Sequence, residues 1–325
     1  MTVHRVVAFL RICAAITLLS ACTTPTAFSS LAAGPLAAEN PANKKSTDLL
    51  YVSTVERNDV TFFTYPAGKL VGTIRGFGNP RGLCVDKSGN IFITNFDGAD
   101  VLEYPHGRTI PKRNIEDTGH GPYGCSIDPT SGNLAVANYC SGYPSGSSGS
   151  CSHGSAAAVT IFDKAKGQPK AFTNQAFEHF FSCAYDSSGN LFVDGYGASG
   201  YSFFEFGEIP RGGTALKRIT LNQTIEYPGG VQWDGQHIAV GDYRTGIIYQ
   251  FTVKGSTGKE TGSTTLTNGE GTSQFWIDGA TVIAADDIHS YDQVIGFWHY
   301  PGGGKATKEL SGYTNPYGIT VSPAK

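Results

Sequence analysis

Short runs of apolar and β-branched residues alternate with polar residues along most of the chain after residue 47. Glycine, proline, asparagine and aspartate separate these runs, a pattern that is typical of β-strands bounded by turns. No long run of helix-forming residues interrupts it. Glycine supplies 42 of the 325 residues, well above its usual share of about 7%. The pattern therefore predicts an all-β protein.

One sequence unit recurs: a first strand that ends at an aspartate, a hairpin turn and a second strand. The unit is clearest in NPRGLCVDKSGNIFITN at 79–95, PYGCSIDPTSGNLAVAN at 122–138 and FFSCAYDSSGNLFVDG at 180–195. Weaker copies follow at 228–242, at 274–286 and at the C-terminal end. The repeated position holds Asp86, Asp128, Asp186, Asp234, Asp278 and finally Ser322, at spacings of 42, 58, 48, 44 and 44 residues. A period in the low forties with about four strands per unit predicts the blades of a β-propeller.

The two ends of the repeat region complete each other. Residues 49–53, 60–65 and 70–74 fit second, third and fourth strands without a first strand, whereas residues 317–321 fit a first strand without successors. Joined, they form one blade, which closes the ring and leaves no open sheet edge. The sequence thus predicts that residues 47–325 form a six-bladed β-propeller with four-stranded antiparallel blades, closed by N- and C-terminal strands in one blade.

The segment from Asn79-Pro80-x-Gly82 to Tyr104 resembles the NHL repeat. More distantly, residues 47–325 resemble the gluconolactonase and regucalcin propellers. This resemblance implies a six-bladed propeller but no single activity, because these proteins differ in function. The gluconolactonase type is expected to hold a divalent metal with Glu, Asn and Asp near the starts of the first strands. Those positions here are Arg81, Tyr123, Phe181, Gly229, Ser273 and Tyr317. The sequence therefore favours a non-catalytic binding or scaffold module, and the alternative is a lactonase-like, metal-dependent hydrolase or lyase.

The N-terminus has the pattern of a bacterial lipoprotein signal peptide, predicted to span residues 1–21. Basic residues precede an apolar stretch at 12–19, which is too short to span a hydrocarbon core of ~30 Å. Leu19-Ser20-Ala21-Cys22 then resembles the lipobox, in which the cysteine is lipidated. We expect an extracytoplasmic protein of the cell envelope, facing the periplasm or the cell surface and bound to the membrane through Cys22. An ordinary secretory signal is the alternative.

Residues 22–46 are rich in Thr, Ser, Ala and Pro without any period, and we predict that they form a flexible tether. Such a chain has an r.m.s. span of roughly 25 Å. Loss of residues 1–21 would remove Arg5 and Arg11, so that the net charge would fall from −3 to −5. Nucleic-acid binding requires a clustered basic face, so we expect no nucleic-acid partner. We also expect a monomer.

Two cysteines bracket a polar insert that has no core of its own, and a disulfide between Cys140 and Cys151 is predicted to close it. Cys84, Cys125 and Cys183 fall inside apolar strand segments. We expect these three to be small buried side chains, with Cys84 unbridged.

Polar residues recur where each second strand ends. These positions hold Ser53, Asn95, Asn138, Gly195 beside Asp194, Asp242 and Asp286. The start of a first strand and the end of a second strand lie on the same face of a propeller, so these residues form a ring near the channel mouth. Their oxygens suit a divalent cation or a polyol. The alternative is that each one hydrogen-bonds turn amides in its own blade.

A second, less symmetric ring comes from the loops that enter the first strands. This ring contains Arg81, Tyr123, Phe181 and Tyr317. The positions three residues earlier in each blade hold Gly78, His120, Glu178, Glu226, Glu270 and Thr314. The loops after the second strands add Tyr139, Tyr196, Tyr243, Arg244, Asp287 and His289. Aromatic rings here suit a sugar or a peptide group, and the glutamates and histidine suit a cation. Rim packing and solvated charge are the alternative. We predict no cofactor other than such a divalent cation.

Overall fold

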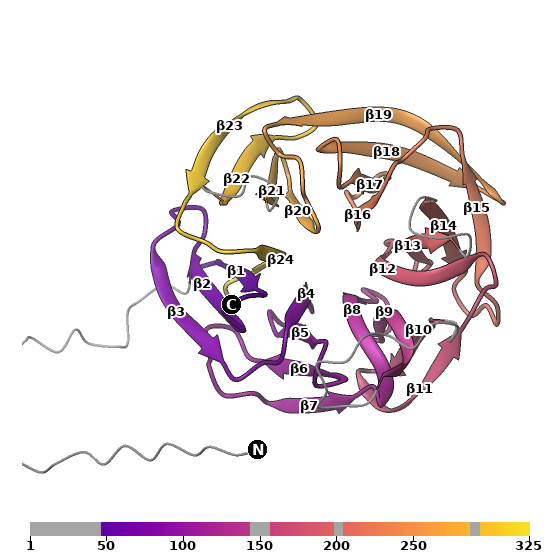
Figure 1. Ribbon diagram of the computed structural model, residues 1–325, viewed down its shortest axis with the longest axis horizontal. Helices are drawn as coiled ribbons and strands as arrows, with labels where there is room; N and C mark the ends of the chain where they lie inside the picture. The colour runs from indigo at the N-terminus through magenta and orange to yellow at the C-terminus, as the bar shows by residue number, and fades with distance from the viewer. Residues whose placement is uncertain (1–46, 144–156, 198–203, 287–292) are drawn as a thin grey trace, which may run out of the picture. The chain divides into compact units, whose positions relative to one another are not determined.

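The computed structural model describes residues 47–143, 157–197, 204–286 and 293–325. They belong to one compact unit, Lys45–Lys325. Within these ranges 24 strands form six four-stranded antiparallel blades. Their innermost strands contact one another in cyclic order, so the unit is a six-bladed β-propeller, as predicted (Figure 1).

Each blade is built from consecutive strands, except for the one that closes the ring. Blade 1 contains β24 (Pro316–Ser322), β1 (Leu49–Thr54), β2 (Asp59–Thr64) and β3 (Leu70–Arg75). Blade 2 contains β4 (Pro80–Val85), β5 (Ile91–Asn95), β6 (Asp100–Tyr104) and β7 (Arg113–Glu116). Blade 3 contains β8 (Gly119–Ile127), β9 (Leu134–Tyr143), β10 (Val159–Asp163) and β11 (Lys166–Phe172).

The remaining blades follow the same order from the channel to the rim. Blade 4 contains β12 (Phe177–Tyr185), β13 (Leu191–Gly197), β14 (Phe204–Ile209) and β15 (Lys217–Leu221). Blade 5 contains β16 (Pro228–Trp233), β17 (Ile238–Asp242), β18 (Ile247–Lys254) and β19 (Thr257–Thr267). Blade 6 contains β20 (Phe275–Asp278), β21 (Thr281–Asp286), β22 (Val294–His299) and β23 (Gly303–Leu310).

The closure predicted from the two ends is confirmed. Strand β24 pairs antiparallel with β1, with Leu50 opposite Val321 and Val52 opposite Ile319. All four of these side chains are buried in one apolar cluster with residues of blade 6. The last strand of the chain is therefore the innermost strand of the first blade.

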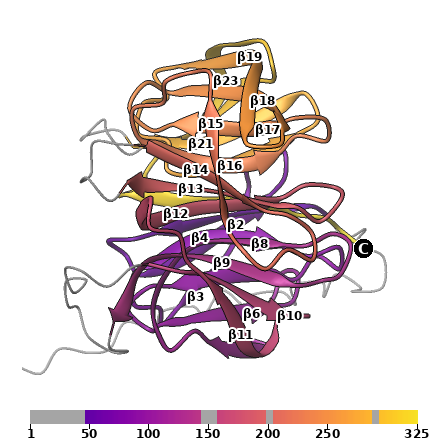
Figure 2. The same ribbon diagram turned by 90° about the vertical axis from the view of Figure 1, so that its right-hand side faces the viewer.

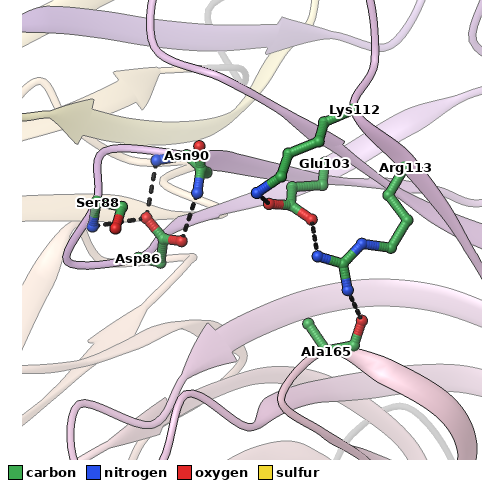
Figure 3. Close-up of polar contacts among 7 residues, drawn as sticks. All are labelled: Asp86, Ser88, Asn90, Glu103, Lys112, Arg113 and Ala165. Atoms are coloured by element: carbon green, nitrogen blue, oxygen red, sulfur yellow. Dashed lines mark hydrogen bonds and ion pairs between the residues drawn. The ribbon is translucent and has the colours of Figure 1, made fainter.

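The repeated aspartate holds the turn between the first and second strands. Asp86 Oδ1 accepts hydrogen bonds from the amides of Ser88 and Asn90, both at 2.8 Å, and its Oδ2 accepts one from Asn90 Nδ2 at 2.7 Å (Figure 3). Asp186 makes the same three bonds to Ser188 and Asn190. A side chain that satisfies turn amides explains why aspartate recurs in the repeat.

The first strands of blades 2 and 3 approach the next blade so closely that each requires a glycine. A Cβ atom on Gly82 would lie 2.6 Å from the carbonyl oxygen of Tyr123, and one on Gly124 would lie 2.7 Å from that of Phe181. Real Cβ contacts of this length essentially never occur. Gly82 and Asp86, four residues apart in the repeat, thus meet two separate requirements: inner-strand packing at the glycine and turn formation at the aspartate.

The expectation that Cys84 is unbridged is wrong, because it forms a disulfide with Cys125 between blades 2 and 3, with the two Cα atoms 5.7 Å apart. The two positions are offset by one residue in the repeat: Cys125 aligns with Leu83. Alternate residues of a strand point to opposite faces, so Cys84 faces blade 3 and Cys125 faces blade 2. Cys183, which aligns with Cys125, is a buried free thiol packed against Ala135, as expected for a filler.

Side chains and backbone also join the blades at the rim. The carboxylate of Glu103 pairs with Lys112 and Arg113, each at 2.7 Å, and Arg113 also donates to the carbonyl oxygen of Ala165 in blade 3 at 2.6 Å (Figure 3). Strand β15 pairs with β19, and β19 with β23, through short parallel bridges along the rim (Figures 1 and 2). In the part of the chain that the structure covers, no helix is long and apolar enough to cross a membrane.

Candidate functional site

Four of the predicted binding residues lie on the innermost strands of four successive blades. They are Tyr317 on β24, Arg81 on β4, Tyr123 on β8 and Phe181 on β12. Hydrogen bonds fix their backbone: Arg81 O accepts from Ser53 Oγ at 2.6 Å, and Tyr123 O accepts from Thr94 Oγ1 at 2.9 Å. The strands and these hydrogen bonds therefore fix the backbone positions from which the side chains project.

The structure brings these four side chains into mutual contact. The ring centroid of Tyr123 lies 4.8 Å from that of Phe181 and 5.3 Å from that of Tyr317. The centroids of Phe181 and Tyr317 are 6.2 Å apart. The Arg81 guanidinium carbon lies 4.9 Å from the ring centroids of both Tyr123 and Tyr317. Side chains that are far apart in the sequence thus form one group, which we call the aromatic cluster together with Phe96, Tyr139, His179 and Tyr196.

The additional members extend the cluster over the loops that follow the second strands. Phe96 and Tyr139 both contact Tyr123, with centroid distances of 5.9 and 5.0 Å. His179 stacks on Tyr139 at 4.3 Å with an interplanar angle of 9°. Tyr196 meets Phe181 edge-on at 6.2 Å. Blades 1 to 4 supply every member of the cluster, and Tyr227, which precedes β16 of blade 5, adjoins it edge-on to Tyr196 at 6.3 Å.

Sequence reasoning named Tyr139 and Tyr196 for this face but missed Phe96 and His179. The signal for Phe96 was present: an aromatic residue directly follows the polar strand-end residue in four blades, at Phe96, Tyr139, Tyr196 and Tyr243. His179 has no such signal, because its role depends on the start of β12 packing against Tyr139 of the neighbouring blade.

The polar residues at the ends of the second strands are buried and hydrogen-bonded. Asn95 Oδ1 accepts from the amide of Gly78 at 2.6 Å, and its Nδ2 donates to Asp100 at 2.8 Å. Asp242 accepts the amides of Glu226 and Arg244 at 3.0 and 3.1 Å. Both residues therefore organise the loops of their own blades.

Asn138 and Asp286 occupy the matching positions in blades 3 and 6. Asn138 Nδ2 donates to Thr160 Oγ1 at 3.0 Å, and Thr160 in turn donates to Asp117 at 2.8 Å. Asp286 is 3% exposed. Asn138 and Asp286 are thus buried, as Asn95 and Asp242 are.

Two of the charged side chains predicted in the outer loops have charged partners, whereas Glu270 Oε2 is buried without a hydrogen-bond partner in the described structure. His120 Nδ1 lies 3.1 Å from Asp117, whose hydrogen bond raises the pKa of this histidine. Glu226 lies 3.6 Å from Arg244. Among the residues with described positions, no group of three or more His, Cys, Asp or Glu side chains is arranged to hold a metal ion. Asp287 and His289 lie outside the described residues.

Beside the predicted ring, Asp194 is a buried carboxyl group in blade 4. It is fully buried, and its Oδ1 accepts the amide of Ser182 at 2.7 Å, whereas its Oδ2 has no hydrogen-bond partner in the described structure. Burial raises its pKa to about 8. The group is therefore protonated at neutral pH.

A separate groove of 660 Å³ lies on the opposite face, between blades 3 and 4. The turn at Asp128–Asn133 and the hairpin at Pro210–Thr214 line it, with Phe172 and Tyr185 on its apolar side and Lys170 and Arg211 at its charged side. No sequence feature predicted this groove.

Of the two predicted disulfide cysteines, only Cys140 has a described position. It is disulfide-bonded. Cys151 lies outside the described residues, and so does Cys22. The pairing of Cys140 with Cys151 therefore stays a prediction.

Comparison with known proteins shows the fold alone. No family model matches the chain, and no curated protein matches it. Among solved structures, a chain in the crystal structure of a nidogen/laminin complex is similar with a TM-score of 0.65 and 11% identity, over 86% of this chain and 99% of that one. A protein of unknown function from Bacteroides caccae is similar with a TM-score of 0.62 and 14% identity, over 85% of this chain and 99% of that one.

Proposed function

We propose that this β-propeller is a non-catalytic binding module, and that its ligand, a saccharide or a peptide, binds at the aromatic cluster. One observation carries the proposal: four successive blades each contribute a different side chain, Tyr317, Arg81, Tyr123 and Phe181, to one group of mutual contacts. Loops from several blades can therefore reach a single ligand.

The asymmetry of the cluster supports a binding role. Blades 5 and 6 place Gly229 and Ser273 where the other blades place Arg81 and the aromatic residues. Packing around a six-fold axis does not require such a difference, whereas a ligand without six-fold symmetry does. Tyr123, Tyr139 and Tyr196 are partly exposed, and a tyrosine ring combines an apolar face with a polar end that suits interfaces.

The hydrogen bonds of the polar residues favour binding over the metal-dependent alternative. A hydrolase or lyase of the lactonase type would need free oxygens near the channel mouth. The Asn95 and Asp242 oxygens instead accept loop amides. Asn138 Oδ1 and Asp194 Oδ2 lack a hydrogen-bond partner in the described structure, but both belong to fully buried side chains. The role of Asn95 and Asp242 in this proposal is to position the loops that carry Phe96 and Arg244.

We further propose that the protein is exported and held at the envelope by a lipid on Cys22, with residues 22–46 as the tether. The lipobox-like sequence Leu19-Ser20-Ala21-Cys22 supports this. The disulfide between Cys84 and Cys125 supports it as well, because structural disulfides persist mainly in oxidising compartments. The repeat between Asn79 and Tyr104 further supports an NHL-type origin of the blades.

The test is a screen of immobilised saccharides and peptides with the exported chain and two variants. Tyr123→Ala removes the central ring of the cluster, and Lys87→Ala changes an exposed turn residue on the opposite face. Each aromatic contact contributes roughly 0.5–1.5 kcal/mol beyond area burial, so Tyr123→Ala should weaken binding about fivefold or more. Lys87→Ala should bind like the wild type. Binding that is lost in Lys87→Ala and retained in Tyr123→Ala would refute the proposed face.

A further inference from the structure

The guanidinium group of Arg81 lies at the centre of the aromatic cluster. Its carbon is 4.9 Å from the ring centroids of Tyr123 and Tyr317 and 5.9 Å from that of Phe96. These distances are within the range of cation–π attraction, which acts through the face of an aromatic ring. The rings therefore hold the cation in place without using its N–H donors.

Among the residues whose positions are described, no acidic side chain forms an ion pair with this cation. Within the described ranges the Arg81 side chain makes no ion pair and no hydrogen bond, and its Nε is buried without a partner. Arg113, by contrast, pairs with Glu103 and donates to a backbone carbonyl (Figure 3), and Arg218 pairs with Glu205 through two nitrogens. Those two arginines thus have polar partners in the structure, whereas Arg81 has none among the described residues.

Burying part of a cation costs free energy when its N–H groups have no hydrogen-bond acceptor, and a ligand oxygen that accepts from them removes this cost. The planar guanidinium presents its N–H groups in a fork that matches the oxygens of a carboxylate, sulfate or phosphate. Resting on the proposed binding function of this face, we propose that the ligand is an acidic saccharide whose anionic group binds Arg81 while its ring stacks on the tyrosines.

The chemistry of the surrounding surface favours a saccharide over an acidic peptide. The partly exposed members of the cluster are tyrosines, whose rings suit the C–H faces of a sugar and whose hydroxyls suit its oxygens. The large exposed aliphatic residues, which an extended peptide would use, lie elsewhere: Leu70 and Val71 on β3, and Ile110 before β7. Among its described residues this face thus offers the unpaired cation of Arg81 beside several aromatic surfaces, while the large exposed aliphatic residues lie elsewhere.

The experiment compares matched saccharides that differ only in charge. Titrations of the exported chain with glucuronic acid, glucose 6-sulfate, glucose 6-phosphate and glucose, and with oligosaccharides built from them, separate the three oxyanions from the neutral ring. At least one acidic form should bind about tenfold to a hundredfold more tightly than its neutral counterpart, as expected for hydrogen bonds to a charged group. This preference should weaken with added salt.

Variants assign the preference to Arg81. Arg81→Gln should abolish it, Arg81→Lys should keep part of it, and Arg211→Gln, which removes the same charge from the opposite face, should leave it unchanged. If Arg81→Gln fails to fold, the preference of the wild-type protein for acidic over neutral saccharides still tests the proposal. If acidic and neutral saccharides bind with equal affinity, and Tyr123→Ala loses this binding, the inference about Arg81 is overturned while the proposed binding face still holds. Arg81-dependent binding of acidic peptides alone would overturn the saccharide assignment. Binding that ignores both Arg81 and Tyr123 would overturn the proposed function as well.

Discussion

Gln274 of blade 6 forms two hydrogen bonds with the backbone of Leu83 in blade 2, across the closure of the ring. Its Nε2 donates to Leu83 O at 2.7 Å, and its Oε1 accepts from Leu83 N at 3.0 Å. The same Oε1 accepts from the amide of Ile319 in blade 1 at 3.2 Å. Gln232 makes the corresponding pair of bonds to Ile277 between blades 5 and 6. Glutamine side chains thus act as strand partners between blades.

We predict that Gln274→Ala destabilises the propeller by about 2–4 kcal/mol, because three backbone groups near the channel lose their partner. Urea unfolding measures the effect. Gln236→Ala is the control, since Gln236 is exposed in a turn of blade 5, and it should unfold like the wild type. Equal stability of Gln274→Ala and Gln236→Ala would show that the cross-ring bonds contribute little.

The fold was predictable because the repeat encodes local requirements. Asp86 and Asp186 hold their turns with the same bonds, and Gly82 permits the close approach of inner strands. Both requirements recur in most blades, so they produce a periodic pattern in the sequence. The unmatched strands at the two ends then fixed the closure, which the pairing of β24 with β1 confirms.

Contacts that occur once are harder to infer. The Cys84–Cys125 disulfide depends on a one-residue offset between two repeats. The offset indicates that the two side chains point toward each other's blade, but it does not give the distance between them. Gln274 and His179 have no counterpart at matching positions, so their roles have no periodic signal. The convergence of Arg81, Tyr123, Phe181 and Tyr317 was expected from strand geometry, and the structure places them together. The lack of an acidic partner for Arg81 among the described residues has no signal in the sequence.

The buried carboxyl of Asp194 should make stability depend on pH. Burial raises its pKa from 3.8 to about 8, so between these values the native state binds one proton more than the unfolded state. Stability contributed by this group is complete below pH 4 and is lost as the pH rises toward 8. Between pH 5 and pH 8 the loss should be on the order of 4 kcal/mol.

Asp194→Asn isolates this effect, because the amide stays neutral and its oxygen can still accept from Ser182. Urea unfolding of both proteins at pH 5 and pH 8 gives the comparison. The stability of the wild type should fall relative to the variant as the pH rises. Parallel pH profiles would mean that Asp194 has an ordinary pKa.

The disulfide between blades 2 and 3 should stabilise the fold. It closes a segment with a sequence separation of 41, for which loop entropy gives about 4 kcal/mol. The double variant Cys84→Ala with Cys125→Ala should unfold at lower urea than Cys183→Ala, which removes a buried free thiol. Peptide mapping without reduction should recover the Cys84–Cys125 link, and a free thiol at Cys84 would contradict it.

Lipidation of Cys22 is tested by expressing the full chain in a bacterium with labelled fatty acid, beside Cys22→Ala. The wild type should carry the label and sediment with membranes, because a lipid on Cys22 anchors the chain. The variant should be unlabelled. Two unlabelled proteins, both recovered in the soluble fraction, would rule out the lipid anchor.

The most direct test of the binding face is a hydrogen–deuterium exchange footprint of the exported chain with the tightest saccharide or peptide from the screen. We predict protection at the starts of β24, β4, β8 and β12, in peptides that contain Tyr317, Arg81, Tyr123 and Phe181, and no change in the turns at 86–90 and 186–190. Protection of those turns, or of the groove lined by Lys170 and Arg211, with exchange at Arg81 and Tyr123 unchanged, would contradict the proposed face.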